Sequence, residues 1–146
     1  TTSASGDFTL NDPSSFTGGT TIIGARAAIT TSGAALGTGT ITTGANGQAF
    51  VITPGLTVAN NFILGSGLGW NEPSGFLGAI RLNTTILSGD ISLTSNARIT
   101  GAGTNTLSGI ISGSFGMDFF EDTVIGTISL TGVNTYTGTT TVNSMG

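Results

Sequence analysis

Two stretches of the chain, 120 positions apart, carry nearly the same sequence. Residues 6–24 read GDFTLNDPSSFTGGTTIIG, and residues 126–144 read GTISLTGVNTYTGTTTVNS. Six positions are identical and five more are conservatively replaced. An echo at a fixed period is the signature of a repeat architecture. We therefore expect residues 1–146 to form a single segment, holding one 120-residue unit and the start of the next, within a longer repeat protein or filament.

A second, shorter echo indicates what such a unit is made of. The hexapeptide LSGDIS at residues 87–92 returns as LSGIIS at residues 107–112, with five of six positions unchanged. This spacing is about one coil of a β-solenoid, in which successive coils stack as parallel strands roughly 4.8 Å apart. We predict an all-β parallel β-helix (β-solenoid) of about seven coils, with the leucines and isoleucines of the two hexapeptides stacked. A 120-residue unit would then hold about six coils, and the two long copies would occupy the same place on the coil.

The composition agrees with a coil that turns tightly and repeats. Charged residues make up 7% of the chain, against about 25% in a typical globular protein, and 25 residues are glycine. Apolar and polar residues alternate, as in Ile80-Arg81-Leu82, which is the period of a half-buried strand. Glycine permits the positive φ angles of tight corners. Scarce charge avoids repulsion between like charges one coil apart.

Several classes of function are excluded or disfavoured by residue content. The chain has no lysine, histidine or cysteine, so disulfide bonds and thiolate or histidine metal sites are ruled out. A net charge of −4 argues against nucleic acid as a partner, because phosphates need a basic patch. No run approaches the roughly 20 apolar residues of a membrane helix, so we expect no membrane insertion of this segment. The chain starts with TTSASG, and we expect any export signal to lie outside it.

The second long copy resembles a known family. Residues 126–142, GTISLTGVNTYTGTTTV, are similar to the passenger-associated transport repeat, also called the autotransporter-associated β-strand repeat, of general form G-x-L-x-L-x-G-x-N-T-Y-T-G-x-T-x-V. The matching positions are Gly126, Leu130, Gly132, Asn134, Thr135, Tyr136, Thr137, Gly138, Thr140 and Val142. Residues 36–41, LGTGTI, resemble the segment that follows the motif in that family. The first copy departs from the motif, with Pro13 adding a rigid kink.

The resemblance implies a right-handed parallel β-helix in an exported bacterial protein. In that family such repeats lie in the passenger regions of autotransporters and in very large surface proteins. Their role is usually that of a stalk or scaffold, linked with passenger secretion and folding. The motif itself is not an active site. We therefore expect an extracellular or cell-surface location.

The densest set of charges is the acidic cluster Asp118, Glu121 and Asp122. Carboxylates are calcium ligands, and calcium takes six to eight oxygens, so a calcium site is one interpretation. The interpretation that we favour is a solvated loop joining two coils, with Phe119 or Phe120 in the core. We predict no metal site and no cofactor.

Paired carboxylates could also cleave a polysaccharide, since glycoside hydrolysis uses two acids about 5 to 10 Å apart. The candidates by residue type are Glu72, Asp90, Asp118, Glu121 and Asp122. Their spacing selects no pair, and without histidine or lysine the chain lacks the usual bases. We expect the protein not to be an enzyme.

Two further motifs each have a structural and a functional interpretation. Trp70, the only tryptophan, could stack on a sugar, although we favour a packing role against the solenoid. Asn83-Thr84-Thr85 fits the N-glycosylation pattern, which in a bacterial protein is expected to arise by chance.

The ends of the predicted solenoid complete the functional hypotheses. Neither end of the sequence carries an amphipathic helix or a charged cap, so we expect the terminal coils to pair head to tail with further copies. The leading hypothesis is a structural segment of a bacterial surface protein or extracellular fibre. An alternative is an adhesin-like module that binds a glycan or calcium on one flank. A polysaccharide-active enzyme is the third hypothesis.

Overall fold

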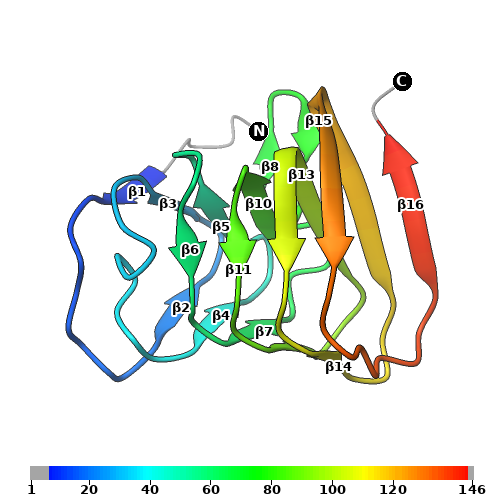
Figure 1. Ribbon diagram of the computed structural model, residues 1–146, viewed down its shortest axis with the longest axis horizontal. Helices are drawn as coiled ribbons and strands as arrows, with labels where there is room; N and C mark the ends of the chain where they lie inside the picture. The colour runs from blue at the N-terminus through cyan, green and yellow to red at the C-terminus, as the bar shows by residue number, and fades with distance from the viewer. Residues whose placement is uncertain (1–6, 145–146) are drawn as a thin grey trace.

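A computed structural model describes residues 7–144, apart from the side chains of residues 122–125. Every regular element within that range is a β-strand. The strands wind into a solenoid of six turns, which runs from β1 at the N-terminal end to β16 at the C-terminal end (Figure 1). The predicted parallel β-solenoid is therefore confirmed, and its predicted number of about seven coils is close to the observed one.

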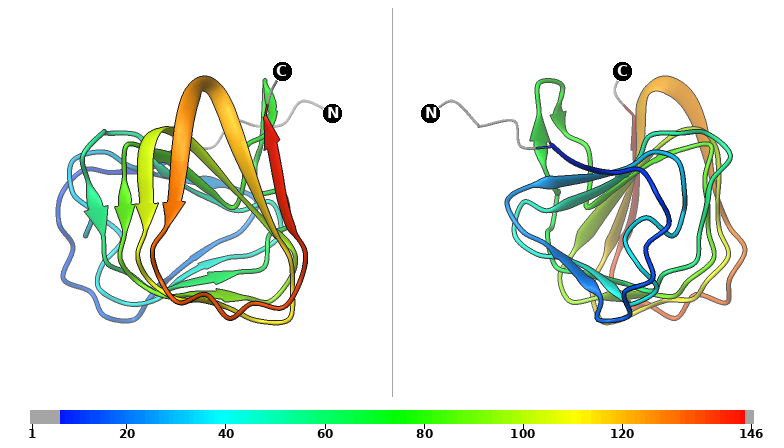
Figure 2. Two further views of the ribbon diagram at one scale, coloured as in Figure 1. Left: turned by 45° about the vertical axis from the view of Figure 1, so that its right-hand side comes forward. Right: turned by 90° about the vertical axis from the view of Figure 1, so that its left-hand side faces the viewer.

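Three columns of stacked parallel strands form the sides of the coil, as the view along the long axis shows (Figure 2). The first column contains β1 (Asp7–Leu10), β3 (Arg26–Ile29), β5 (Gln48–Val51), β10 (Ile80–Asn83), the first parts of β13 (Ala97–Leu107) and β15 (Met117–Leu130), and β16 (Thr140–Ser144). The second column contains β6 (Thr57–Val58), β11 (Ile86–Leu87) and the second parts of β13 and β15. The third column contains β2 (Thr20–Ile22), β4 (Ile41–Thr43), β7 (Phe62–Leu64), β12 (Ile91–Leu93) and β14 (Ile111–Ser112).

The register of the first column defines the length of each coil. One inward-facing ladder runs through all seven strands of this column, from Phe8 through Ala27, Ala49, Ile80, Ile99 and Phe119 to Val142. The numbering of these register partners shows coils of similar length, except for one longer coil between Ala49 and Ile80. The longer coil carries an antiparallel hairpin, β8 (Asn71–Glu72) and β9 (Gly75–Phe76), which projects from the solenoid (Figure 2).

The short echo of the two hexapeptides is confirmed as a stacking repeat. Leu87 pairs with Leu107 in the second column, and Ile91 pairs with Ile111 in the third. The glycine between them has a steric reason, because a Cβ on Gly109 would lie 2.0 Å from the carbonyl oxygen of Gly89 in the coil below. The shared sequence of the two hexapeptides therefore reflects direct contact between neighbouring coils.

The expectation that the two long copies share a place on the coil is wrong. In the first copy β1 lies in the first column, whereas the matching residues 127–130 of the second copy lie in the second column. Six turns of the ladder run from Phe8 to Val142, because the inserted hairpin lengthens one coil. The position 120 places after Phe8 is Ile128, so the long echo falls short of six turns by part of a coil.

The core lies inside the three columns and is made of stacked aliphatic side chains. Its fully buried members include Ile29, Ile41, Leu64, Leu87 and Ile99. Each is an inward-facing residue of a strand, as the alternation of apolar and polar residues predicts. Stacking these residues along the axis gives one continuous core in which every coil shares contacts with its neighbours.

Candidate functional site

All three arginines of the chain lie in the first column, and each contacts the β8–β9 hairpin. The Nη1 groups of Arg26 and Arg81 donate to Oε2 of Glu72 at 2.9 and 2.7 Å. Arg98 Nη1 donates to the backbone oxygen of Phe76 at 2.8 Å. Because the chain has no lysine or histidine, all of its positively charged side chains help to hold this hairpin on the solenoid.

Glu72 is an anchor of the hairpin, and its environment explains why it can be buried. Its side chain is only 7% exposed, and burying a carboxylate is costly unless cations pair with it. The ring of Phe50 lies beneath both guanidinium groups, 5.1 Å from that of Arg26 and 4.6 Å from that of Arg81. Such cation–π contacts hold the two cations in place beside the carboxylate. Glu72 therefore joins the hairpin to two strands of the first column through its two arginine partners.

Arg26 also ties the first strand to this cluster. Its Nε and Nη2 groups donate to the two carboxylate oxygens of Asp7 at 2.8 and 2.6 Å. These hydrogen bonds lower the pKa of Asp7 below its ordinary value, and they raise the pKa of Arg26. A single guanidinium thus links β1, β3 and the hairpin.

The acidic cluster at residues 118–122 lies within strand β15, so the predicted loop between coils is wrong. Phe119 is buried in the core, as predicted for one of the two phenylalanines. Asp118 accepts hydrogen bonds from Arg98 Nε at 2.7 Å and Asn143 Nδ2 at 2.8 Å. Glu121 Oε1 accepts from the backbone N–H of Gly126 at 3.0 Å.

These bonds use the two acids to join neighbouring strands and to shape the bend of β15. The side chain of Asp122 lies outside the described residues. Among the side chains that the structure does describe, no three or more acidic groups gather in a way that could hold a metal ion. The calcium interpretation therefore has no ligand cluster in the described part of the chain.

The other residues singled out in the sequence are scattered over the solenoid. Trp70 is half-buried just before β8, where it belongs to the base of the hairpin. Asp90 Oδ1 accepts from the backbone N–H of Ile110 in the next coil at 2.8 Å. Asn83 Nδ2 donates to the backbone oxygen of Ile52 at 2.8 Å. Asp90 and Asn83 thus join neighbouring coils, and the three residues do not converge on one site.

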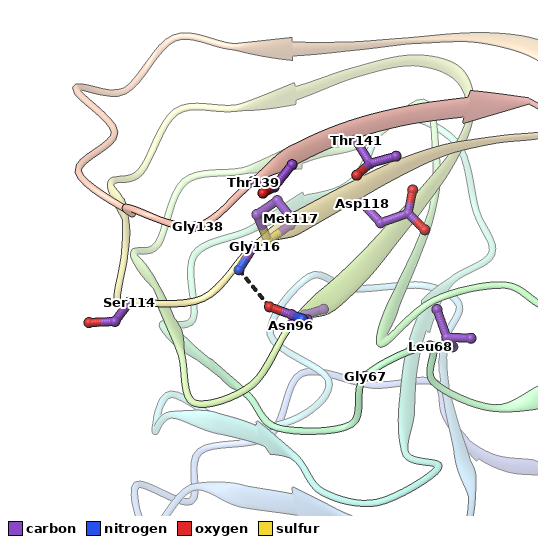
Figure 3. Close-up of a pocket in the computed structure, with 11 residues that line it drawn as sticks. Gly67, Leu68, Asn96, Ser114, Gly116, Met117, Asp118, Gly138, Thr139 and Thr141 are labelled. Atoms are coloured by element: carbon purple, nitrogen blue, oxygen red, sulfur yellow. Dashed lines mark hydrogen bonds between the residues drawn. The ribbon is translucent and has the colours of Figure 1, made fainter.

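A groove of about 490 Å³ lies between the base of the hairpin and the later coils (Figure 3). Gly67 and Leu68 form one wall, and Asn96, Asp118 and Thr141 lie on the other side. Asn96 Oδ1 accepts from the backbone N–H of Gly116 at 2.8 Å, so this side chain is fixed in place. The groove has a mixed lining of polar and apolar atoms, with the amide of Asn96 and the hydroxyl of Thr141 among its polar groups.

The C-terminal end of the solenoid forms a second hollow, of about 500 Å³. Its apolar lining comes from the inner side of the last coil and includes Phe119, Ile128, Leu130 and Val142. Val142 belongs to the inward-facing ladder of the first column, yet it is 79% exposed. At the opposite end Phe8, the first member of the same ladder, is 62% exposed. Both ends therefore present core residues to solvent.

The arrangement of the arginines is the feature that sequence reasoning missed. Each arginine is flanked by an apolar residue in a strand pattern, which predicts an outward position but no partner. Their partners Glu72 and Phe76 come from an insertion that has no strand periodicity. The available signal was the rarity of positive charge, since the chain has three arginines and no lysine or histidine.

No helix in the described range is long and apolar enough to cross a membrane.

The chain matches no protein-family model, and no curated protein or solved structure matches it. The resemblance of residues 126–142 to the autotransporter-associated repeat remains an expectation drawn from the sequence.

Proposed function

We propose that this chain is a structural section of a β-solenoid rod, in an exported bacterial surface protein or an extracellular fibre. The observation that carries the proposal is the open C-terminal end of the core, where Val142 faces inward and is 79% exposed. An inward-facing valine gains its free energy of burial only when another coil covers it. Among residues 7–144, β16 pairs with β15 alone, so the backbone groups on its outer edge could be satisfied by a further parallel strand.

The distribution of polar groups supports a scaffold role. The carboxylates of Asp7, Glu72 and Asp118 are each paired with an arginine. Asp90 is bound to the backbone of the next coil. These four carboxylates therefore join neighbouring strands or coils, which is the role expected of acids in a scaffold. Export and a surface location rest on the resemblance of residues 126–142 to the transport repeat.

The proposal is tested by adding a coil. Residues 122–144 make one turn, because Glu121 pairs with Ser144 one coil later. A variant with a second copy of residues 122–144 added directly after Ser144 should fold as a longer solenoid, since each new strand meets the register it already accepts. Hydrogen exchange should then show slower exchange for the amides of the original last strand than in the unmodified chain. An added segment that stays unprotected, with no change in the exchange of the original strand, would contradict the rod.

Resistance to trypsin is a second check on the structural role. Trypsin cleaves after lysine and arginine, and the three arginines all lie in hydrogen-bonded strands of the first column. We expect the native chain to survive trypsin at concentrations that degrade the urea-unfolded chain within minutes. Rapid cleavage of the native chain after Arg26, Arg81 or Arg98 would show that the column opens too often to serve as a stalk.

A glycan-binding role is the second candidate, and the groove beside the hairpin, with its mixed polar and apolar lining, favours it. Leu68, Asn96 and Thr141 line that groove from the hairpin base and from two later coils. A glycan array on the intact chain, repeated with N96A and T141V, checks this candidate. Binding that both variants weaken would support the groove, whereas binding unaffected by either variant would place any glycan site elsewhere.

A further inference from the structure

The longest coil of the solenoid contains an insertion that leaves and rejoins the coil at nearly the same point. Register partners in the first column are 19 to 23 positions apart in the other coils, but Ala49 and Ile80 are 31 positions apart. The backbone N–H of Gly78 donates to the backbone oxygen of Leu68 at 2.9 Å. Residues 69–77, which contain the β8–β9 hairpin, are therefore an insertion with its two ends side by side.

The surface on which this insertion lies is built by strands of the solenoid. Arg26, Phe50 and Arg81 come from β3, β5 and β10, which are neighbours in the first column. The ring of Phe50 lies within 5.1 Å of both guanidinium groups. Asp7 binds Nε and Nη2 of Arg26, so that Nη1 points to the hairpin. Because the solenoid itself makes these contacts, we expect the surface to keep its shape without the hairpin.

The hairpin meets this surface as a bound peptide would. Oε2 of Glu72 accepts from Nη1 of Arg26 and of Arg81, at 2.9 and 2.7 Å. The backbone oxygen of Phe76 accepts from Nη1 of Arg98 at 2.8 Å. Guanidinium groups are suited to both acceptors, because they carry several donors in a fixed plane. The three arginines thus bind one glutamate side chain and one main-chain oxygen four positions further on.

We propose that the three arginines and Phe50 form a binding site for a glutamate-containing peptide, and that the β8–β9 hairpin is the chain's own ligand in this site. When the hairpin is lifted, the site takes an acidic peptide segment of a partner. An acidic sugar would supply the carboxylate but not the main-chain oxygen, so the contacts favour a peptide. The inference does not depend on the rod, because it concerns an outward face of the first column.

The hairpin is an incompletely matched ligand for the site. Both arginine bonds go to Oε2 of Glu72, whereas its Oε1 is buried and has no hydrogen-bond partner among the described residues. A buried oxygen that lacks a donor weakens the association that buries it. A peptide that brings a further donor beside its carboxylate can therefore compete with the hairpin, against the advantage that tethering gives the hairpin.

Deletion of the insertion tests whether the solenoid forms the site by itself. Removing residues 69–77 and joining Leu68 to Gly78 brings this coil within the length range of the others. Leu77, the buried apolar residue that is lost, lies outside the core cluster. We expect the deletion variant to keep the circular dichroism of a β-solenoid and to unfold cooperatively. It also lacks Trp70, the only tryptophan, so the fluorescence of an added peptide can be followed alone.

The probe is the peptide GWNEPSGFLG, which is residues 69–78 of the chain. Its tryptophan fluorescence should change in a saturable way when the deletion variant is added. The matched E72Q peptide keeps the shape and loses the charge, and we expect it to bind at least ten-fold more weakly. Adding R81A to the deletion variant should remove most of this difference, because one of the two donors is lost. Galacturonate, a free sugar acid, should compete at least ten-fold less well than the unlabelled peptide.

The full chain provides a second test through E72A, which vacates the carboxylate position and leaves the hairpin in place. Acetate has the size of the group that is removed, so it should bind between the two arginines. The melting temperature of E72A should rise by about 4 °C at an acetate concentration ten times its dissociation constant, relative to equal sodium chloride. The unmodified chain and E72A/R81A should show no such difference between the two salts.

Four results would overturn the inference. A deletion variant that does not fold would show that the solenoid does not form the site alone. A folded variant that binds no peptide at millimolar concentration, or binds both peptides equally, would exclude a glutamate site. Equal competition by galacturonate would assign the site to acidic sugars. Equal melting temperatures of E72A in acetate and chloride would show that the two arginines do not hold a free carboxylate.

Discussion

The two copies of the long repeat lie at opposite ends of the solenoid, and they use opposite sides of the same motif (Figure 1). In the first copy the motif is the first layer of the solenoid, and the backbone oxygen of Phe16 accepts from the N–H of Thr38 in the second coil at 3.0 Å. In the second copy the motif is the last layer of the solenoid, and the N–H of Thr137 donates to the backbone oxygen of Gly113 in the preceding coil at 3.0 Å. Two similar sequences thus pair with a neighbouring coil on opposite sides.

The copies also differ in where they sit on the coil. Strand, turn and strand of the first copy run from the first column to the third, whereas those of the second copy run from the second column to the first. A three-sided coil offers similar corners at each side, so the motif can be placed at more than one of them. The motif is therefore a unit of two strands and a turn that can occupy different columns of the solenoid. The neighbouring coil determines which contacts it makes.

The largest expected difference between the copies concerns one matched glycine. A Cβ on Gly138 would lie 2.2 Å from the backbone nitrogen of Gly116, whereas a Cβ on Gly18 would meet nothing within 4 Å. We expect G138A to lower the free energy of unfolding by roughly 2–3 kcal/mol, because the backbone of the preceding coil cannot move away from the added Cβ.

The control G18A should leave that free energy unchanged or raise it by about 0.5 kcal/mol, since alanine restricts the unfolded chain. Urea denaturation of both variants measures the difference. An equal decrease in the free energy of unfolding for G18A and G138A would mean that the space around Gly18 is filled in the folded protein.

A smaller difference is expected at the asparagine of the second copy's motif. Asn134 Oδ1 accepts from the backbone N–H of buried Ile111 at 2.8 Å. We expect N134A to cost about 1–2 kcal/mol, because it leaves that donor without its partner. The matched residue of the first copy, Ser14, contacts the second coil through its backbone N–H, which bonds to Ala34 O and survives S14A.

Thermal unfolding of N134A and S14A, followed by circular dichroism, compares the two. A change for S14A as large as that for N134A would show that the side chain, rather than the backbone, joins the first copy to its neighbour.

The aromatic residue of the motif should matter less. The hydroxyl group of Tyr136 lies 2.6 Å from Thr140 Oγ1 near the surface. Y136F, which introduces the phenylalanine found in the first copy, should cost about 0.5–1 kcal/mol. A double-mutant cycle with T140V isolates the hydrogen bond, and a coupling energy of zero would show that it adds nothing to the last coil.

The smallest effect is a pH dependence confined to the first copy. Asp7 has a lowered pKa in the folded protein, and the matched residue of the second copy is the uncharged Thr127. A carboxyl group whose pKa is lowered by folding stabilises above its unfolded value, about 3.9, and this stabilisation disappears as the pH falls through the folded value. Hydrogen exchange of β1 should therefore quicken relative to residues 127–130 when the pH falls below about 4.

The D7N variant removes the titrating group and should lose this pH dependence while keeping the neutral-pH fold. A first strand that loosens with the same pH profile in D7N would assign the effect to another group.

The short echo shows how far local sequence reasoning reaches in this fold. Leu87 and Ile91 could be placed on Leu107 and Ile111 because a solenoid stacks equivalent residues one coil apart. The coil length, the parallel pairing and the inward ladders all depend on this local periodicity. The candidate sites were harder to judge, since the function of Asp118 depends on Arg98 and Asn143, which lie one coil below and one coil above it.

The sequence by itself determined the all-β solenoid, because alternating strands, glycine corners and a short repeat one coil long leave few other ways to bury the apolar residues. Only the tertiary structure decided where the hairpin of residues 71–76 docks, since Glu72 meets Arg26 across 46 positions of the chain. The tertiary structure also decided in which columns the two long copies lie. The inserted hairpin adds residues to one coil, so residues 120 positions apart do not fall at the same place on the coil. Contacts between adjacent coils follow from local spacing, whereas ion pairs across several coils depend on how much chain is inserted between them.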